Sequence, residues 1–193
     1  MTWNKGDKIE EIFFVTNRFY TGIGSRKAPL PILKRAQALG KELAIKGFTG
    51  RSGKAEGMDE AFMKGFGEAG SGRFVNYLPY PSFRESLALP AGCDDISCYS
   101  NDVWKEAVLI ARGIYGKGWF EITPGARDLH TRNVFQVLGD DLKTPSEFVL
   151  YWAEPEGRNA VKGGTNTAFQ VARQFSIGCY NVQSPLVKLI LQT

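Results

Sequence analysis

The chain has a single histidine, His130, and only three cysteines in 193 residues. A zinc site built on two histidines is therefore excluded, and Cys93, Cys98 and Cys179 lack the spacing of a metal-binding motif. No stretch approaches the roughly 18 to 20 apolar residues that a membrane-spanning helix requires. The first residues also lack the apolar centre and cleavage site of a secretory signal. We therefore expect a cytoplasmic protein with reduced thiols, and we expect no metal or other cofactor.

Net charge is also small. The sequence has 24 Lys and Arg against 20 Asp and Glu, which gives a formal charge of +4. Such an excess permits an anionic ligand without requiring one, because nucleic-acid-binding proteins usually concentrate their positive charge in patches. The nucleotide-triphosphatase pattern G-x-x-x-x-G-K-[ST] is missing. The length and the 43% hydrophobic content predict one packed domain over residues 1–193.

Short β-rich runs alternate with helical stretches along the chain. We expect strands at 13–20, 48–51, 73–78, 147–152 and 179–182, and helices at 32–46, 56–69, 102–112, 128–138, 165–175 and 185–191. Residues 81–146 are expected to form an irregular or helical insertion, with Pro124-Gly125 as a turn and Asn101 or Asp102 as a helix cap. Strand–loop–helix units in series predict an α/β, Rossmann-like three-layer fold with a mostly parallel central sheet.

Parallel sheets of this kind bind ligands at the carboxyl ends of their strands. Glycine-rich segments follow three of the expected strands, and glycine lets backbone N–H groups approach an anion. The first segment carries Gly22, Gly24, Ser25 and Arg26, and Arg26 is a planar cation suited to phosphate. A tight turn with an exposed arginine is the alternative for this segment.

The second segment precedes the helix expected from residue 56. It contains Arg51, Ser52, Gly53, Lys54, Ala55 and Asp59. Small residues and two cations beside a helix N-terminus favour a bound anion. Asp59 is open to several interpretations: it caps the helix, contacts a ribose hydroxyl or orders the neighbouring loops.

The third segment lies between the late strand and the helix expected from residue 165. It contains Gly163, Gly164, Thr165, Asn166 and Thr167. Two glycines and two hydroxyl residues at a helix start form an anion cradle or a simple helix cap. In the middle region, Arg132 is a further candidate for phosphate and Asn133 for a base edge. The alternative is a surface arginine beside an asparagine that faces its own helix.

The segments Gly22-Ile23-Gly24-Ser25-Arg26 and Arg51 to Phe62 resemble the two signatures of the bacterial DNA-processing protein A family (DprA, or Smf), with Met58 in an isoleucine position. Residues 163–168 and 180–182 resemble the third element of that family. The resemblance covers 20–80 and 147–183 and places the chain in the SLOG superfamily of Rossmann-type domains. It implies binding of a nucleotide or a single-stranded nucleic acid, self-association and a recombinase partner. Small stand-alone proteins of this pattern suggest a bacteriophage source.

The same superfamily includes the Lonely Guy phosphoribohydrolases, whose motif P-G-G-x-G-T-x-x-E ends in a glutamate that matters for catalysis. Here Asn166 stands where that motif has glycine, and Gln170 stands where it has the glutamate. A neutral amide is unable to act as a general base or as an anionic stabiliser. We therefore expect a binding protein rather than an enzyme. A nucleotide phosphoribohydrolase or N-glycosidase, and a sensor or sponge of a signalling nucleotide, remain the alternatives.

Overall fold

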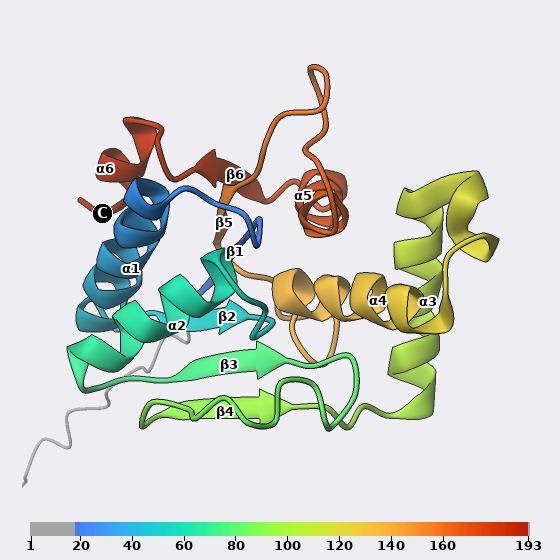
Figure 1. Ribbon diagram of the computed structural model, residues 1–193, viewed down its shortest axis with the longest axis horizontal. Helices are drawn as coiled ribbons and strands as arrows, with labels where there is room; N and C mark the ends of the chain where they lie inside the picture. Colours follow the sequence, from blue (N-terminus) through green and yellow to red (C-terminus); the bar gives the residue numbers. More distant parts are fainter. Residues whose placement is uncertain (1–17, 193) are drawn as a thin grey trace, which may run out of the picture.

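The computed structural model describes residues 18–192, which contain a six-stranded parallel sheet in the order β4-β3-β2-β1-β5-β6 (Figure 1). The strands are β1 (Phe19–Gly24), β2 (Thr49–Ser52), β3 (Phe74–Tyr77), β4 (Cys93–Ile96), β5 (Phe148–Trp152) and β6 (Gly178–Asn181). The helices are α1 (Leu30–Ile45), α2 (Met58–Ala69), α3 (Asn101–Tyr115), the 3-10 helix η1 (Gly116–Phe120), α4 (Pro124–Leu138), α5 (Thr165–Gln174) and α6 (Leu186–Ile190).

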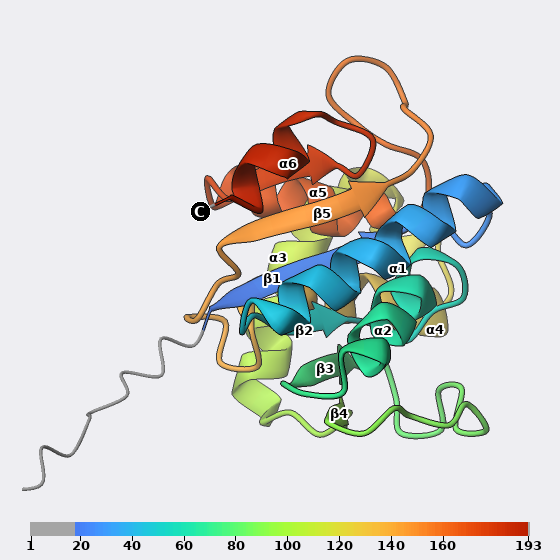
Figure 2. The same ribbon diagram turned by 90° about the vertical axis from the view of Figure 1, so that its left-hand side faces the viewer.

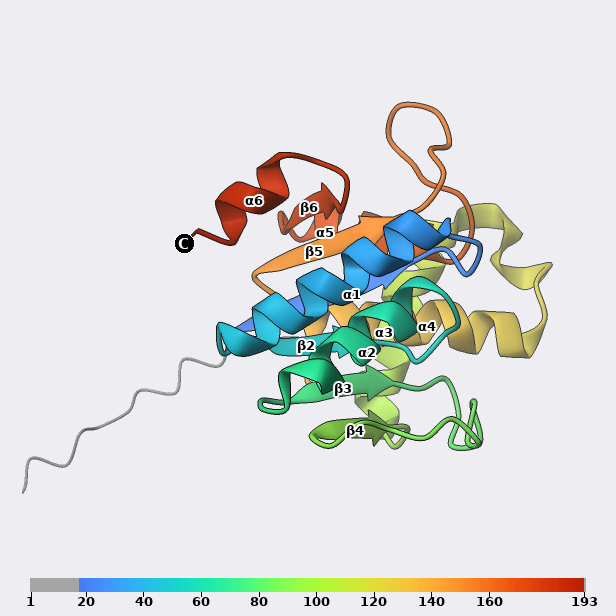
Figure 3. The same ribbon diagram turned by 60° about the vertical axis from the view of Figure 1, so that its left-hand side comes forward.

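Helices cover both faces of the sheet because the strand side chains alternate in direction. In β5, Phe148 and Leu150 pack in one core with α1, α2 and α6, whereas Val149 packs in a second core with α3, α4 and α5. Figures 2 and 3 show α1 and α2 in front of the sheet and α3 to α5 behind it. The predicted three-layer α/β fold is confirmed. No helix among the described residues is both long and apolar enough to cross a membrane.

The structure corrects several expected boundaries. β1 continues to Gly24 instead of ending at residue 20, and expected strand residues 13–17 lie outside the described part of the chain. The helix cap is Ser100, whose Oγ accepts from Val103 N, and α3 extends to Tyr115. Pro124 occupies the first turn of α4 instead of a separate turn, a position that suits its fixed φ.

The largest correction is β4, which lies inside the stretch expected to be irregular. It is an edge strand of four residues, and Asp94 and Asp95 in its centre are exposed. An edge strand with charged side chains shows no run of apolar residues, so the periodicity gave no signal. The middle region therefore supplies part of the sheet as well as α3 and α4.

The helices α1 and α2 pack closely at two glycines, each of which faces the backbone of the other helix. A Cβ on Gly40 would overlap the Phe62 carbonyl oxygen, and a Cβ on Gly65 would overlap that of Gln37. The start of α2 is thereby held against the end of β1, where the pocket described below opens.

We predict that Gly65→Ala destabilises the fold by about 1–3 kcal/mol, because the added methyl group pushes α2 away from α1. Gly113→Ala in α3 is the matched control: its Cβ would meet no atom within 4 Å, so we expect it to stabilise by roughly 0.5–1 kcal/mol. Urea denaturation of both variants checks this. Equal effects of the two substitutions would contradict the packing argument.

Candidate functional site

A pocket of about 610 Å³ opens at the carboxyl edge of the sheet. In the sheet, β2 lies on one side of β1 and β5 lies on the other. The strand order therefore changes direction at β1, and ligands of such folds bind at the carboxyl edge beside this switch point. All three glycine-bearing segments contribute, together with α4 and the β3–β4 connection. The predicted site residues that line the pocket are Gly24, Ser25, Arg26, Ala55, Asp59, Arg132, Asn133, Gly163, Gly164 and Thr165.

The first segment is mainly a strand and not a loop. Gly22 and Gly24 both belong to β1. A Cβ on Gly22 would lie 2.5 Å from the Phe62 ring, and one on Gly24 would lie 2.5 Å from the Met58 side chain. These glycines therefore let α2 pack on β1. Only Ser25 and Arg26, beyond the end of the strand, fit the expected phosphate-binding loop.

Three predicted residues of the second segment point away from the pocket. The buried Arg51 guanidinium donates to Thr144 O (2.6 Å) and stacks on the Phe19 ring at 3.7 Å. Ser52 Oγ donates to Gly22 O (2.6 Å). Lys54 Nζ, almost completely buried, pairs with Asp95 of β4 at 2.5 Å. These side chains fasten neighbouring segments, and we remove them from the candidate phosphate ligands.

Asp59 joins the first two segments. Its Oδ1 accepts from Gly24 N (3.3 Å), and its Oδ2 accepts from Ala55 N (3.4 Å) and from Arg132 Nη1 (3.5 Å). Complete burial raises the pKa of Asp59, and the Arg132 charge opposes this rise. Of the interpretations of Asp59, the structure supports the ordering of the neighbouring loops.

Arg132 is a buried residue of α4, only 5% exposed, and not the surface arginine of the alternative interpretation. Gly53 is essential to its position, because a Cβ there would overlap the Arg132 guanidinium. The Arg132 Nε atom is buried and has no hydrogen-bond partner among the described residues. Desolvation lowers the pKa of Arg132, and Asp59 is the main group that opposes this.

Two amide side chains of α4 connect the second segment to the third. With its amide oxygen turned toward Gly53, Gln136 accepts from Gly53 N (2.8 Å) and from Arg132 Nη1 (2.6 Å), and its amide nitrogen donates to Asn133 Oδ1 (3.0 Å). Asn133 Nδ2 donates to Gly164 O at 2.9 Å. Asn133 therefore holds a backbone carbonyl at the start of α5, a use that competes with reading a base edge.

The third segment divides between the pocket and its support. Gly163 (φ +76°), Gly164 and Thr165 line the pocket at the N-terminus of α5, whereas Asn166 and Thr167 do not. Asn166 Oδ1 accepts from Val161 N (3.2 Å) and Gln170 Nε2 (3.2 Å). Thr167 Oγ1 lies 2.7 Å from His130 Nδ1.

Gln170, at the position of the Lonely Guy glutamate, does not line the pocket. Its Nε2 donates to Asn159 O at 2.7 Å and so ties the loop after β5 to α5. No group of three or more metal-ligating side chains occurs within residues 18–192. The carboxylates that do line the pocket are Glu56 and Asp59.

Sequence reasoning missed several lining residues. These are Ile23, Lys27, Glu56, Phe83, Arg84, Ala126, Leu129, His130, Gln136, Lys162 and Ala168. The spacing of three or four residues through Ala126, Leu129, Asn133 and Gln136 marks one face of a helix and was available as a signal. Phe83 and Arg84 lie on an irregular connection, and no local pattern identifies them.

We predict that the only histidine titrates below its ordinary value, because burial and the Arg132 charge lower the pKa of His130. A lowered pKa in the folded state means that stability is present above about pH 6.5 and is lost as the pH falls. NMR titration of the imidazole measures the pKa directly. In His130→Gln, the free energy of unfolding should fall less between pH 7 and pH 5 than in the wild type; an imidazole pKa at or above 6.5 would contradict this.

No protein-family model and no curated protein sequence matches the chain. Among solved structures, the molybdenum cofactor carrier protein of Chlamydomonas reinhardtii superposes with TM-scores of 0.51 and 0.50 at 15% and 16% identity, over 91% of this chain and 83% of that one. DNA processing protein A (DprA) of Streptococcus pneumoniae gives a TM-score of 0.51 at 13% identity, and the match spans 91% of this chain but 56% of DprA. The chain therefore shares the Rossmann-type fold of the molybdenum cofactor carrier protein and of DprA.

Proposed function

We propose that the pocket binds a nucleotide through its phosphate, either as a free molecule or as one unit of a single-stranded nucleic acid. The phosphate lies beside Arg132 and Arg26, at the N-terminus of α5. The volume of about 610 Å³ is within the usual range for sites that hold small molecules.

The observation that carries this proposal is the incomplete pairing of Arg132. A buried guanidinium normally has all its N–H groups satisfied, and an exception calls for an explanation such as an absent ion. Within the described part of the chain Nε has no partner, whereas Nη1 donates to the Gln136 amide oxygen at 2.6 Å and lies 3.5 Å from Asp59 Oδ2. A phosphate oxygen in the pocket would complete the hydrogen bonds of a cation that the fold has already placed.

The surrounding charge supports an anion. Five cationic side chains and two carboxylates line the pocket, and they are Arg26, Lys27, Arg84, Arg132, Lys162, Glu56 and Asp59. Arg26 and Lys27 have no ion-pair partner among the described residues. The N-terminus of α5 adds the positive end of a ten-residue helix.

One structural neighbour supports the same class of ligand. It is named as a DNA processing protein, and DNA carries phosphate along its length. The resemblance to DprA also leads us to propose a homo-oligomer and a recombinase partner. Gln170 stands where the phosphoribohydrolase motif has its glutamate, and its amide donates to the loop after β5. A neutral side chain at this position favours binding without cleavage of the ligand.

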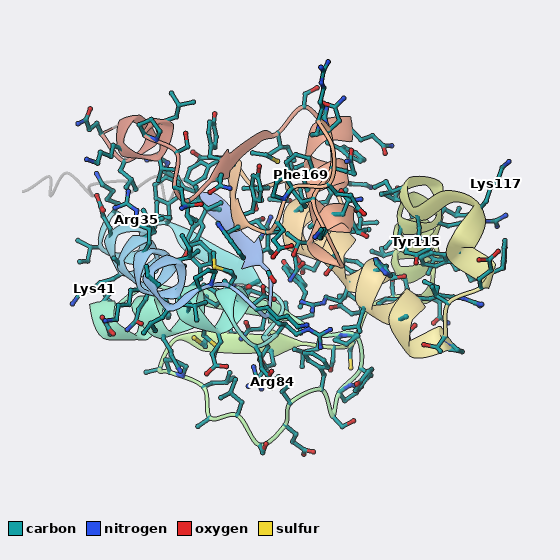
Figure 4. The ribbon with its side chains drawn as sticks, turned by 45° about the horizontal axis from the view of Figure 1, so that its top comes forward. Arg35, Lys41, Arg84, Tyr115, Lys117 and Phe169 are labelled. Carbon is teal, nitrogen blue, oxygen red and sulfur yellow. The ribbon has the colours of Figure 1, made fainter. Side chains whose placement is uncertain are left out.

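We predict that Arg26→Ala weakens nucleotide binding by about 10-fold, since a charge-assisted hydrogen bond to phosphate is lost. Calorimetry with nucleoside monophosphates and with oligothymidylate measures this loss. The matched control is Lys117→Ala, which removes an exposed cation of η1 outside the pocket lining (Figure 4). If single-stranded DNA is the ligand, affinity also falls steeply with added salt because counterions are released.

Failure of the wild-type protein to bind either probe would rule out the proposal, as would equal binding by the two variants. Release of free base from a nucleoside monophosphate by the wild-type protein, followed by chromatography, would show that the site is a hydrolase instead.

A further inference from the structure

Phe83 is an aromatic side chain of the pocket wall that neither the fold nor the phosphate site explains. It lies on the connection between β3 and β4, is half-buried, and lines the pocket. Among the described lining residues it is the only phenyl ring, and the Arg132 guanidinium lies 5.7 Å from its centre. An aromatic face beside a phosphate-binding cation matches the two halves of a nucleotide.

Resting on the proposed function, we infer that Phe83 is the stacking platform for the base and makes the pocket selective for nucleotides over sugar phosphates. Four aliphatic side chains, Ile23, Ala126, Leu129 and Ala168, also line the pocket. A sugar phosphate has no apolar surface to place against them, whereas a planar heterocycle does.

Hydrogen bonds and ring packing fix the position of the connection that carries Phe83. The neighbouring Arg84 donates from Nη1 and Nη2 to Glu60 Oε2 at 3.1 Å each, and from Nη1 to Lys54 O at 3.0 Å. Arg84 thereby ties the connection to α2 and to the second glycine-bearing segment, and Figure 4 shows it on this connection below the sheet. Tyr80 packs edge-on against Phe83 with 5.7 Å between ring centroids.

The backbone supports a positioned role for this connection. Arg84 has φ +49° and Lys54, whose carbonyl it binds, has φ +58°. Left-handed conformations of such residues are costly, and they persist where surrounding contacts enforce them, often at ligand sites. Both strained residues of this contact lie beside the pocket, so the contacts of Arg84 hold Phe83 in place before any ligand arrives.

The test compares Phe83→Ala with Phe175→Ala, which removes an aromatic ring that is 43% exposed and outside the pocket lining. The probes are AMP and ribose 5-phosphate, which share the sugar phosphate and differ by the base. Loss of stacking should weaken AMP binding to Phe83→Ala by roughly 10-fold, within the range known for base–aromatic contacts. Ribose 5-phosphate binding should stay within about twofold, and Phe175→Ala should bind both probes as the wild type does.

A second variant, Phe83→Trp, keeps a stacking surface and adds a reporter. AMP should bind it at least as tightly as the wild type and should change its tryptophan emission, whereas ribose 5-phosphate should not. Thermal unfolding of each variant confirms that the fold is intact.

The outcomes separate this inference from the proposed function. If the wild-type protein binds both probes equally, or if Phe83→Ala loses both to the same degree, the phosphate site stands and the stacking platform is wrong. If the wild-type protein binds neither probe, the proposed function fails and this inference fails with it.

Discussion

The buried contact between Asp59 and Arg132 is the constraint on which the pocket depends. Asp59 comes from α2 and accepts from the backbone at the end of β1 and in the segment before α2, while Arg132 comes from α4 on the opposite face. Two charges placed in the interior lose their hydration, and the loss of either one leaves the other uncompensated at a cost of about 3–5 kcal/mol. The pair is therefore better understood as a device that fixes positions than as a source of stability.

Glycine has a different role here from the one that glycine-rich sequences suggest. Gly22 and Gly24 let α2 pack on β1, and Gly53 leaves space for the Arg132 guanidinium. In each case the missing Cβ permits contact with another element, and the backbone N–H groups have a secondary role. Close packing at the sheet edge thus positions the Arg132 guanidinium, whose Nε has no hydrogen-bond partner within residues 18–192.

The helix α4 organises the opposite wall. Through Gln136 and Asn133 it connects Gly53 to Gly164, and through His130 it contacts Thr167. Tyr115 from the end of α3 packs edge-on against His130 with 4.7 Å between ring centroids. The amide positions that separate this chain from the phosphoribohydrolase motif have structural partners of their own, since Asn166 and Gln170 hold the loop after β5. These neutral side chains consequently serve as support, and the cations that line the pocket fit the anion site that we propose.

Local sequence determined most of the secondary structure and the edge of the sheet at which a site would lie. Periodicity predicts α1, α2 and α5 within a few residues, and parallel strands necessarily bring their carboxyl ends to one edge. Tertiary structure decided which side chains reach the pocket. Arg51 and Lys54 stand in the same segment as Asp59, yet the side-chain direction in a strand and a contact with β4 turn them away from the pocket. Phe83, Arg84 and β4 gave no local signal, because their places depend on contacts with segments distant in the chain. A single sequence contains local preferences, whereas the direction of a buried side chain is settled only when its partners are packed around it.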